Sequence, residues 1–189
     1  MKVEVLKYPT EKDLLWVKQC TLNTVGKSTT KAPTEEWLKR LVEAEHSPIR
    51  ELWFGIKMEV PYWVAMHYRT HQIADGNYDI SIRPDFKNDY ISTQREDRVS
   101  DGVPRNEKPQ GEIVSYIMSI NAPALINMAH KRLCKQASAE TQAVMREIVK
   151  KVVEVAPYMK SVLIPLCAYR NGKCTEMFPC KKGSTENGK

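Results

Sequence analysis

The chain has 189 residues, 42% of them hydrophobic, and its 29 Lys and Arg against 23 Asp and Glu give a formal net charge of +6. This length suits one domain with one core, and no apolar run approaches the roughly 20 residues that span a bilayer. The N-terminus lacks the apolar segment of a secretory signal, so we expect a cytosolic protein. The sequence also has no long block of Lys and Arg, the feature that marks a nucleic-acid-binding arm. Residues 1–182 are predicted to form a single domain, followed by a disordered tail over residues 183–189.

The first third of the chain alternates predicted strands and helices. Residues 1–7 predict a short strand and residues 11–22 a helix. Thr34 is placed to cap a second helix, because negatively charged residues follow it in the first turn. Residues 52–60 alternate strictly between apolar and polar, which makes this the clearest strand. Pro61 suits the first turn of a following helix, where its missing N–H is not needed.

Residues 73–111 interrupt this pattern. They are rich in Asp, Asn, Arg, Pro and Gly, and their few apolar residues show no helical or strand periodicity. This pattern predicts a functional loop or disorder. Residues 112–121 again predict a strand, and Pro123 opens a helix that runs to about Leu133. The last predicted helix, over residues 139–156, has a buried stripe made of Val144, Ile148, Val152 and Val155. These elements predict an α+β fold, with a small mixed or antiparallel sheet flanked by helices.

Two histidines of the helix after Pro61 are candidate site residues. His67 and His71 are one helical turn apart and so share a face. That spacing could supply two zinc ligands, but Tyr68 stands where the H-E-x-x-H motif has its glutamate, and no third ligand is near. We therefore interpret both as polar residues of a site without a metal.

The segment Ser92–Arg98, with Arg105 beyond it, is dense in arginine and hydroxyl groups. Fixed hydroxyl donors and bidentate guanidinium groups are what a phosphate monoester requires. The alternative is a solvated cluster in which Glu96 and Asp97 neutralise the arginines. Ser81 and Arg83 form a smaller version of the same pattern and compete with it for this role.

Asn127 and the C-terminal cysteines leave further alternatives open. Asn is mildly unfavourable inside a helix, so Asn127 indicates either a function or a capping role. Cys167, Cys174 and Cys180 lack a tight C-x-x-C pair, and a structural zinc would need Cys134 or a neighbouring subunit to complete four ligands. Three reduced thiols are the favoured interpretation.

Residues 44–156 resemble the flavin-dependent thymidylate synthases. His46-Ser47-Pro48, followed by a strand, a proline and a helix, is similar to the H-x-[ST]-P region of that family. The R-H-R hallmark of the family corresponds here to Thr70-His71-Gln72-Ile73-Ala74. The histidine and the following Ile-Ala are kept, and both arginines are replaced. Further along the chain the family has the signature N-A-R-x-L-x-N-x-x-x-x-R…E. Its spacing is matched here by Asn121, Ala122, Leu125, Asn127, Arg132 and Glu140. Pro123 replaces an arginine of that signature.

The resemblance implies a single catalytic domain that binds dUMP and FAD, with no metal. The substrate-binding residues it implies are His67, Thr93, Gln94, Arg95, Arg105 and Arg132, of which Arg132 is also the catalytic residue. The cofactor-binding residues it implies are His46, Ser47, His71, Gln72, Ile73, Asn121, Asn127 and Gln136. Thr93 and Arg95 are preferred to Ser81 and Arg83 at the phosphate, because Thr93-Gln94-Arg95 matches the S-Q-R motif of the family with Thr in place of Ser. The insertion that this match requires falls in a loop, where added length costs little.

The implied reaction is reductive methylation of dUMP at C5, with methylenetetrahydrofolate as the carbon donor, reduced FAD as the hydride source and NADPH restoring the flavin. The family also implies a homotetramer with sites between subunits, and neither a membrane nor nucleic acid as partner. Two alternatives remain at this point. One is a folate-dependent pyrimidine-nucleotide hydroxymethylase on the same fold, and the other is a non-catalytic nucleic-acid or interaction module.

Overall fold

A four-stranded antiparallel sheet organises the protein, whose structure is a computed structural model that describes residues 1–70, 77–79 and 107–180. The strands lie in the order β1-β2-β4-β3. Their bounds are Lys2–Lys7 for β1, Trp53–Pro61 for β2, Asn77–Asp79 for β3 and Ile113–Asn121 for β4. The predicted α+β class is confirmed. β3 corrects the sequence analysis, because it lies inside the segment predicted to be irregular.

The central pair, β2 and β4, follows directly from the period-two pattern. Trp53 pairs with Asn121 and Pro61 with Ile113, so the two strands are in register over their full length. Alternate residues point to the core and are almost fully buried, namely Phe54, Ile56, Met58, Val60, Val114, Tyr116, Met118 and Ile120. Ile113, expected among the strand's apolar residues, is 59% exposed at the beginning of β4. The long β2–β4 pairing fixes where the helices that follow each strand begin.

The described residues form six α-helices and two 3-10 turns. Their bounds are Glu11–Asn23 for α1, Glu35–Glu43 for α2, Ser47–Glu51 for η1, Tyr62–Arg69 for α3, Ala122–Arg132 for α4, Ala139–Val155 for α5, Pro157–Met159 for η3 and Leu166–Tyr169 for α6. Thr34 caps α2 as predicted, its hydroxyl accepting from the Trp37 amide at 3.2 Å. Thr10 and Asp13 form a capping box at α1 that the sequence analysis did not single out.

Three helix predictions need correction. Pro61 ends β2 and caps α3, so the helix begins one residue later than expected. α3 ends at Arg69, and His71, predicted to share its face with His67, lies outside the described residues. Val155 was placed in the buried stripe of α5 but is 36% exposed, because it is the last residue of the helix.

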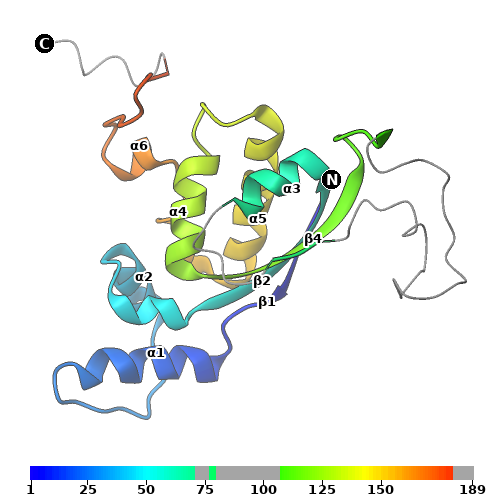
Figure 1. The fold of residues 1–189 in the computed structure, drawn as a ribbon. Coiled ribbons are helices and arrows are strands. Elements are labelled where there is room, and N and C mark those ends of the chain that lie inside the picture. The colour runs from blue at the N-terminus through cyan, green and yellow to red at the C-terminus, as the bar shows by residue number, and fades with distance from the viewer. Residues whose placement is uncertain (71–76, 80–106, 181–189) are drawn as a thin grey trace, which may run out of the picture.

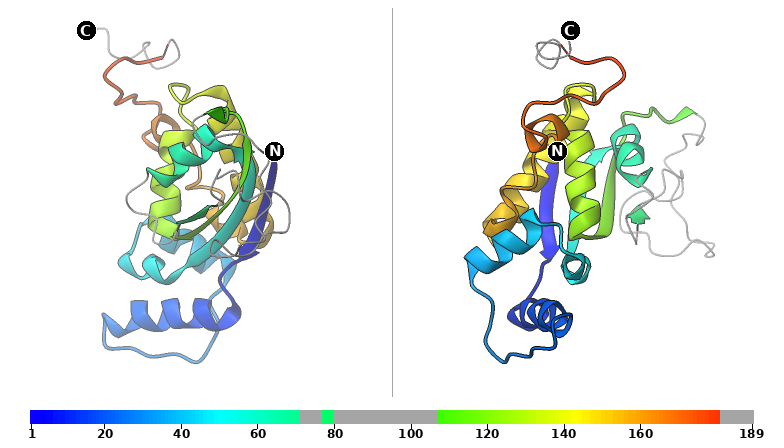
Figure 2. Two further views of the ribbon diagram at one scale, coloured as in Figure 1. Left: turned by 45° about the vertical axis from the view of Figure 1, so that its right-hand side comes forward. Right: turned by 90° about the vertical axis from the view of Figure 1, so that its left-hand side faces the viewer.

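The helices that matter for the site lie together on the sheet. α4 and α5 run side by side, and α3 contacts α5 and the ends of β2 and β4 (Figures 1 and 2). One hydrophobic core joins the inner face of the sheet to these helices. α1 and α2 lie at one end of this body, and α6 leads the C-terminal residues past α4 (Figure 1). In the part of the chain that the structure describes, no helix is long and apolar enough to cross a membrane.

Candidate functional site

Helix α4 separates the predicted site residues into two groups. Asn121 is the last residue of β4 and the N-cap of α4, and Arg132 is the last residue of the helix. At 1.5 Å per residue, the 11 residues of α4 span about 16 Å. Asn121 therefore lies at one end of α4, and Arg132, with the His67 carbonyl that it contacts, lies at the other.

At the C-terminal end, Arg132 is anchored by the backbone of α3. Its Nη2 donates to the carbonyl oxygen of His67 at 2.7 Å. The Thr70 hydroxyl donates to the same oxygen at 3.1 Å. Arg132 is half-buried, and this burial lowers the pKa of its guanidinium, although a guanidinium stays charged at any physiological pH. The result is a fixed positive charge at the junction of α3 and α4.

The His67 side chain is held by the first turn of α5. Its Nδ1 lies 3.1 Å from the hydroxyl of the buried Thr141. The Ser138 hydroxyl donates to the same Thr141 oxygen at 2.8 Å, which leaves the Thr141 hydrogen available for Nδ1. When the Thr141 hydroxyl donates to Nδ1, the ring carries its proton on Nε2. Trp63 contacts the ring edge-to-face, with centroids 5.4 Å apart.

Three helix ends therefore meet around Arg132 and His67: the C-termini of α3 and α4 and the N-terminus of α5. The Tyr68 hydroxyl binds α3 to α5 by donating to the Thr141 carbonyl at 2.8 Å, and burial raises the pKa of this phenol. Ser138 caps α5 and accepts from the Thr141 amide at 3.3 Å. The two helix C-termini carry partial negative charge and the N-terminus of α5 carries partial positive charge, so the Arg132 cation is the group at this junction that favours an anionic ligand.

Polar groups are also exposed on η1 and along the first half of α4. His46 and Ser47 are exposed at the start of η1, and the Ala122 amide donates to the Leu52 carbonyl at 2.8 Å, which ties the end of η1 to the start of α4. The Asn121 side-chain oxygen accepts from the Ala124 amide at 3.1 Å, leaving the Nδ2 group as the donor for a ligand. Asn127 is exposed on α4, in an orientation different from that of the half-buried Arg132.

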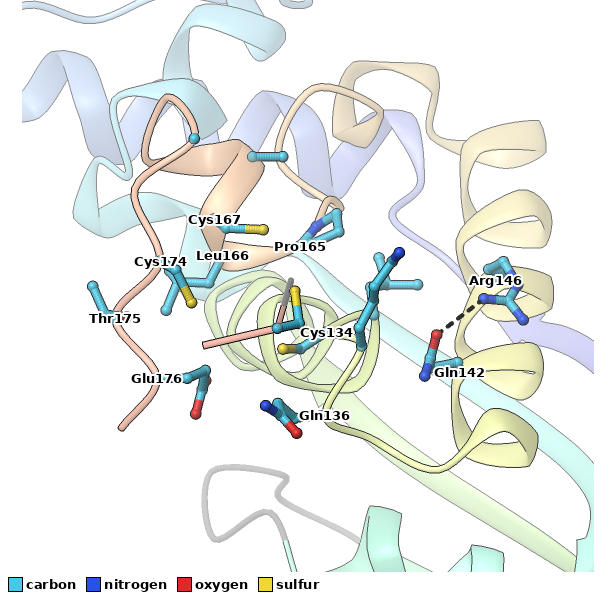
Figure 3. Close-up of a pocket in the computed structure, with 15 residues that line it drawn as sticks. Cys134, Gln136, Gln142, Arg146, Pro165, Leu166, Cys167, Cys174, Thr175 and Glu176 are labelled. Atoms are coloured by element: carbon cyan, nitrogen blue, oxygen red, sulfur yellow. Dashed lines mark hydrogen bonds between the residues drawn. The ribbon is translucent and has the colours of Figure 1, made fainter. Parts of the chain in front are cut away.

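Gln136 has a different environment from the other predicted cofactor residues. Its Nε2 donates to the Phe178 carbonyl, so it contacts the C-terminal segment. It also lines a pocket of about 380 Å³ between the end of α4 and α6 (Figure 3).

Several predicted site residues fall in the parts of the chain that are not described. These are His71, Gln72, Ile73, Thr93, Gln94, Arg95 and Arg105, together with the competing pair Ser81 and Arg83. Their roles stay predictions. The sequence analysis missed Ser138 and Thr141, which position His67. Ser138 before a helical pattern is a recognisable N-cap signal, but only the tertiary structure brings Thr141 to a histidine 74 residues away.

Comparison with known protein families gives one match. The family model for "Thymidylate synthase complementing protein" matches residues 108–158. That segment contains β4, α4 and α5, and with them Asn121, Arg132, Ser138 and Thr141. No curated protein sequence matches the chain.

Solved structures show the same fold over most of the chain. Thymidylate synthase X from Helicobacter pylori with FAD and dUMP is 12% identical, with a TM-score of 0.61 over 86% of this chain and 97% of that chain. A flavin-dependent thymidylate synthase ThyX from the same organism, complexed with FAD and dUMP, gives 13% and 0.62 over 86% and 98%. The UMP/dUMP methylase PolB from Streptomyces cacaoi, bound with 5-Br dUMP, gives 13% and 0.63 over 85% and 93%.

Proposed function

We propose a function from one premise: the chain is a divergent member of the thymidylate synthase complementing protein family, the flavin-dependent thymidylate synthases. The proposed reaction is reductive methylation of dUMP at C5, with methylenetetrahydrofolate as carbon donor and reduced FAD as hydride source. NADPH would restore the flavin. The observation that carries this proposal is the position of Arg132, a half-buried cation fixed at the junction of α3, α4 and α5.

Arg132 would bind and orient the nucleotide. One of its N–H groups is committed to the His67 carbonyl, and this bond sets the plane of the guanidinium. A guanidinium with a fixed plane can make the paired hydrogen bonds that an anionic oxygen requires, and its charge stabilises negative charge that develops on a pyrimidine ring. The Nε2 atom of His67 is a second polar group at the same junction.

FAD is proposed to bind the polar groups of η1 and of the first half of α4. His46, Ser47 and Asn127 are exposed, and Asn121 retains its Nδ2 donor while its oxygen caps the helix. These residues would hold the cofactor, with Gln136 beyond the far end of α4. Bound reduced FAD supplies the hydride, and the protein supplies orientation and electrostatics.

The test is turnover of dUMP labelled with tritium at C5, in the presence of FAD, NADPH and methylenetetrahydrofolate. We expect tritium release and a 5-methyl product, with no release when FAD is left out. A 5-hydroxymethyl product would identify the hydroxymethylase instead. A colourless protein that neither binds dUMP nor releases tritium would exclude both enzymes and leave the non-catalytic module.

A further inference from the structure

The pocket at the C-terminal end of α4 lies beside the proposed nucleotide site but is not part of it. Its volume is about 380 Å³, and its lining comes from the turn after α4, the N-terminal half of α5, α6 and the C-terminal segment as far as Cys180 (Figure 3). Neither Arg132 nor His67 lines this pocket. Gln136 lines it and is also assigned to the proposed cofactor site.

The walls of this pocket are half-buried and mainly apolar. Leu133, Pro165 and Leu166 form part of them, and helix α6 has no fully buried residue. Four of the five cysteines also line the pocket as half-buried free thiols, namely Cys134, Cys167, Cys174 and Cys180. In the described part of the chain no group of three or more His, Cys, Asp or Glu side chains could hold a metal ion, so these thiols serve as small apolar groups. The walls therefore offer apolar surface that a ligand can cover.

Contacts outside the pocket hold its walls in place. Tyr169 of α6 packs against the buried His130 of α4, with ring centroids 4.6 Å apart, and its hydroxyl donates to Glu45. The C-terminal segment is linked to the same end of α4 by the ion pair of Lys131 with Glu176 at 3.2 Å. Walls that are fixed in this way are typical of ligand pockets, which are largely pre-formed.

The positively charged residues of the pocket are exposed and have no acidic partner. Lys135 and Arg146 both line it, and neither forms an ion pair with any of the described residues. Arg146 Nη1 donates to the side-chain oxygen of Gln142 at 3.4 Å (Figure 3), and Gln142 Nε2 donates to the Ala137 carbonyl at 2.7 Å. Glu176 also lines the pocket, but its carboxylate already forms the ion pair described above. Two available cations therefore border an apolar cavity.

We propose that this pocket binds a small amphipathic carboxylate, with its apolar body between the walls and its carboxylate at Lys135 and Arg146. An apolar cavity of about 150 Å³ holds one benzene ring, so a pocket of about 380 Å³ has room for two rings and a carboxylate. A few charged groups beside apolar walls fix the orientation of such a ligand. The guanidinium of Arg146 suits a carboxylate, because its N–H donors form a planar fork. This site goes beyond the proposed function and requires neither dUMP nor FAD.

The first test compares three probes by isothermal titration calorimetry with the full chain. Naphthoate has two fused rings and a carboxylate, naphthamide has the same rings without the charge, and acetate has the charge without the rings. We expect naphthoate to bind about fivefold more tightly than naphthamide, the upper range for an exposed ion pair, and acetate not to bind measurably. Equal affinities for naphthoate and naphthamide, or no binding of naphthoate, would overturn the proposal.

Variants test the charged and the apolar part of the pocket separately. Arg146→Gln and Lys135→Gln should each lower the affinity for naphthoate toward that for naphthamide. Lys150→Gln is the matched control, because Lys150 is an exposed cation of the same helix α5 that does not line the pocket. Ala168→Trp places a large side chain at an exposed position of the α6 wall and should abolish naphthoate binding. Native affinity in all the pocket variants would reject this site.

The cysteines report occupancy of the pocket in the native chain. Alkylation by iodoacetamide depends on access to each thiol, and peptide mass spectrometry follows every cysteine separately. Saturating naphthoate should slow the alkylation of the four pocket cysteines several-fold, while Cys20 of α1, which does not line the pocket, should react at an unchanged rate. Unchanged alkylation of all four, or equal slowing of Cys20, would show that naphthoate does not occupy this pocket.

Saturating FAD is the final competitor, because Gln136 lines the pocket and is also assigned to the cofactor. Naphthoate should bind equally with and without FAD. Displacement of naphthoate by FAD would assign the pocket to the cofactor and overturn a separate carboxylate site. None of these measurements depends on dUMP turnover, so failure of the carboxylate site and failure of the proposed reaction are distinguishable.

Discussion

The Arg132 side chain connects α4 to α3 through one backbone oxygen. The His67 carbonyl accepts both from Arg132 at 2.7 Å and from the Thr70 hydroxyl at 3.1 Å. Loss of the guanidinium therefore leaves this oxygen with the Thr70 hydroxyl as a partner. Urea unfolding of each Arg132 variant separates an effect on folding from an effect on activity.

Arg132→Ala should weaken dUMP binding by about 1.5–3 kcal/mol, the range for a hydrogen bond to a charged group. Arg132→Lys should recover part of the loss, since it restores the charge but not the planar pair of donors. Isothermal titration calorimetry measures both, and Lys150→Ala on the exposed face of α5 is the matched loss of a cation. Unchanged dUMP affinity in Arg132→Ala would contradict the proposed role.

His130 should make the protein less stable in mild acid. The side chain is 7% exposed and its Nε2 has no hydrogen-bond partner among the described residues. Burial lowers its pKa below the ordinary 6.5, and the nearby Glu45 offsets this only in part. As pH falls below 6.5 the unfolded chain takes up a proton that the folded chain resists, so the free energy of unfolding decreases.

Urea unfolding over this pH range measures the effect. His130→Phe, which keeps a ring in the core but cannot titrate, should show a shallower loss of stability toward acid than the native chain. His46→Ala is the control, because His46 is exposed and should leave the slope unchanged. Equal slopes in the native chain and in His130→Phe would show that His130 is not responsible.

At the scale of single elements, α4 has both structural and proposed functional roles. Its buried residues face the sheet and α5, while Asn121 and Arg132 stand at its two ends. Asn121 is the residue where these roles coincide, because its side-chain oxygen caps the helix and its Nδ2 group is the proposed donor to FAD.

Two substitutions of Asn121 should separate the roles. Asn121→Asp keeps the oxygen that accepts from the Ala124 amide but removes the Nδ2 donor, so stability should stay close to native while FAD binding weakens. Asn121→Ala removes both and should also destabilise the fold by about 1 kcal/mol. Denaturant unfolding and flavin fluorescence titration measure the two effects. If Asn121→Asp binds FAD as the native chain does, Asn121 serves only as a cap.

At the scale of the whole molecule, FAD should raise the melting temperature of the flavin-free chain. A ligand that binds only the folded state stabilises it by about 2.7 kcal/mol at 100 times its dissociation constant. dUMP should raise the melting temperature further, since its proposed site lies at the other end of α4. Differential scanning fluorimetry with each ligand alone and with both measures this. Riboflavin, which lacks the adenylate half, is the control. No shift with saturating FAD would contradict the flavin proposal.

Much of the fold could be predicted from local patterns. The alternation in β2 and β4 determined which residues are buried, because successive side chains of a strand point to opposite faces. Thr34 was predicted as an N-cap because capping depends on residues within one turn. The errors fell at boundaries, where Pro61 and Val155 lie at the ends of elements and local propensity is weakest. The short β3 was missed because it has too few residues to show a period.

The candidate site depended on contacts that no local pattern contains. The strand and helix periods and the family resemblance could be taken from the sequence alone, and they were enough to name His67, Asn121 and Arg132. The contact of Arg132 with the backbone of His67, 65 residues away, and the lining of one pocket by four cysteines could not. Both depend on the pairing of β2 with β4, which sets where α3 and α4 begin, and on packing against α5, which brings the ends of these helices together.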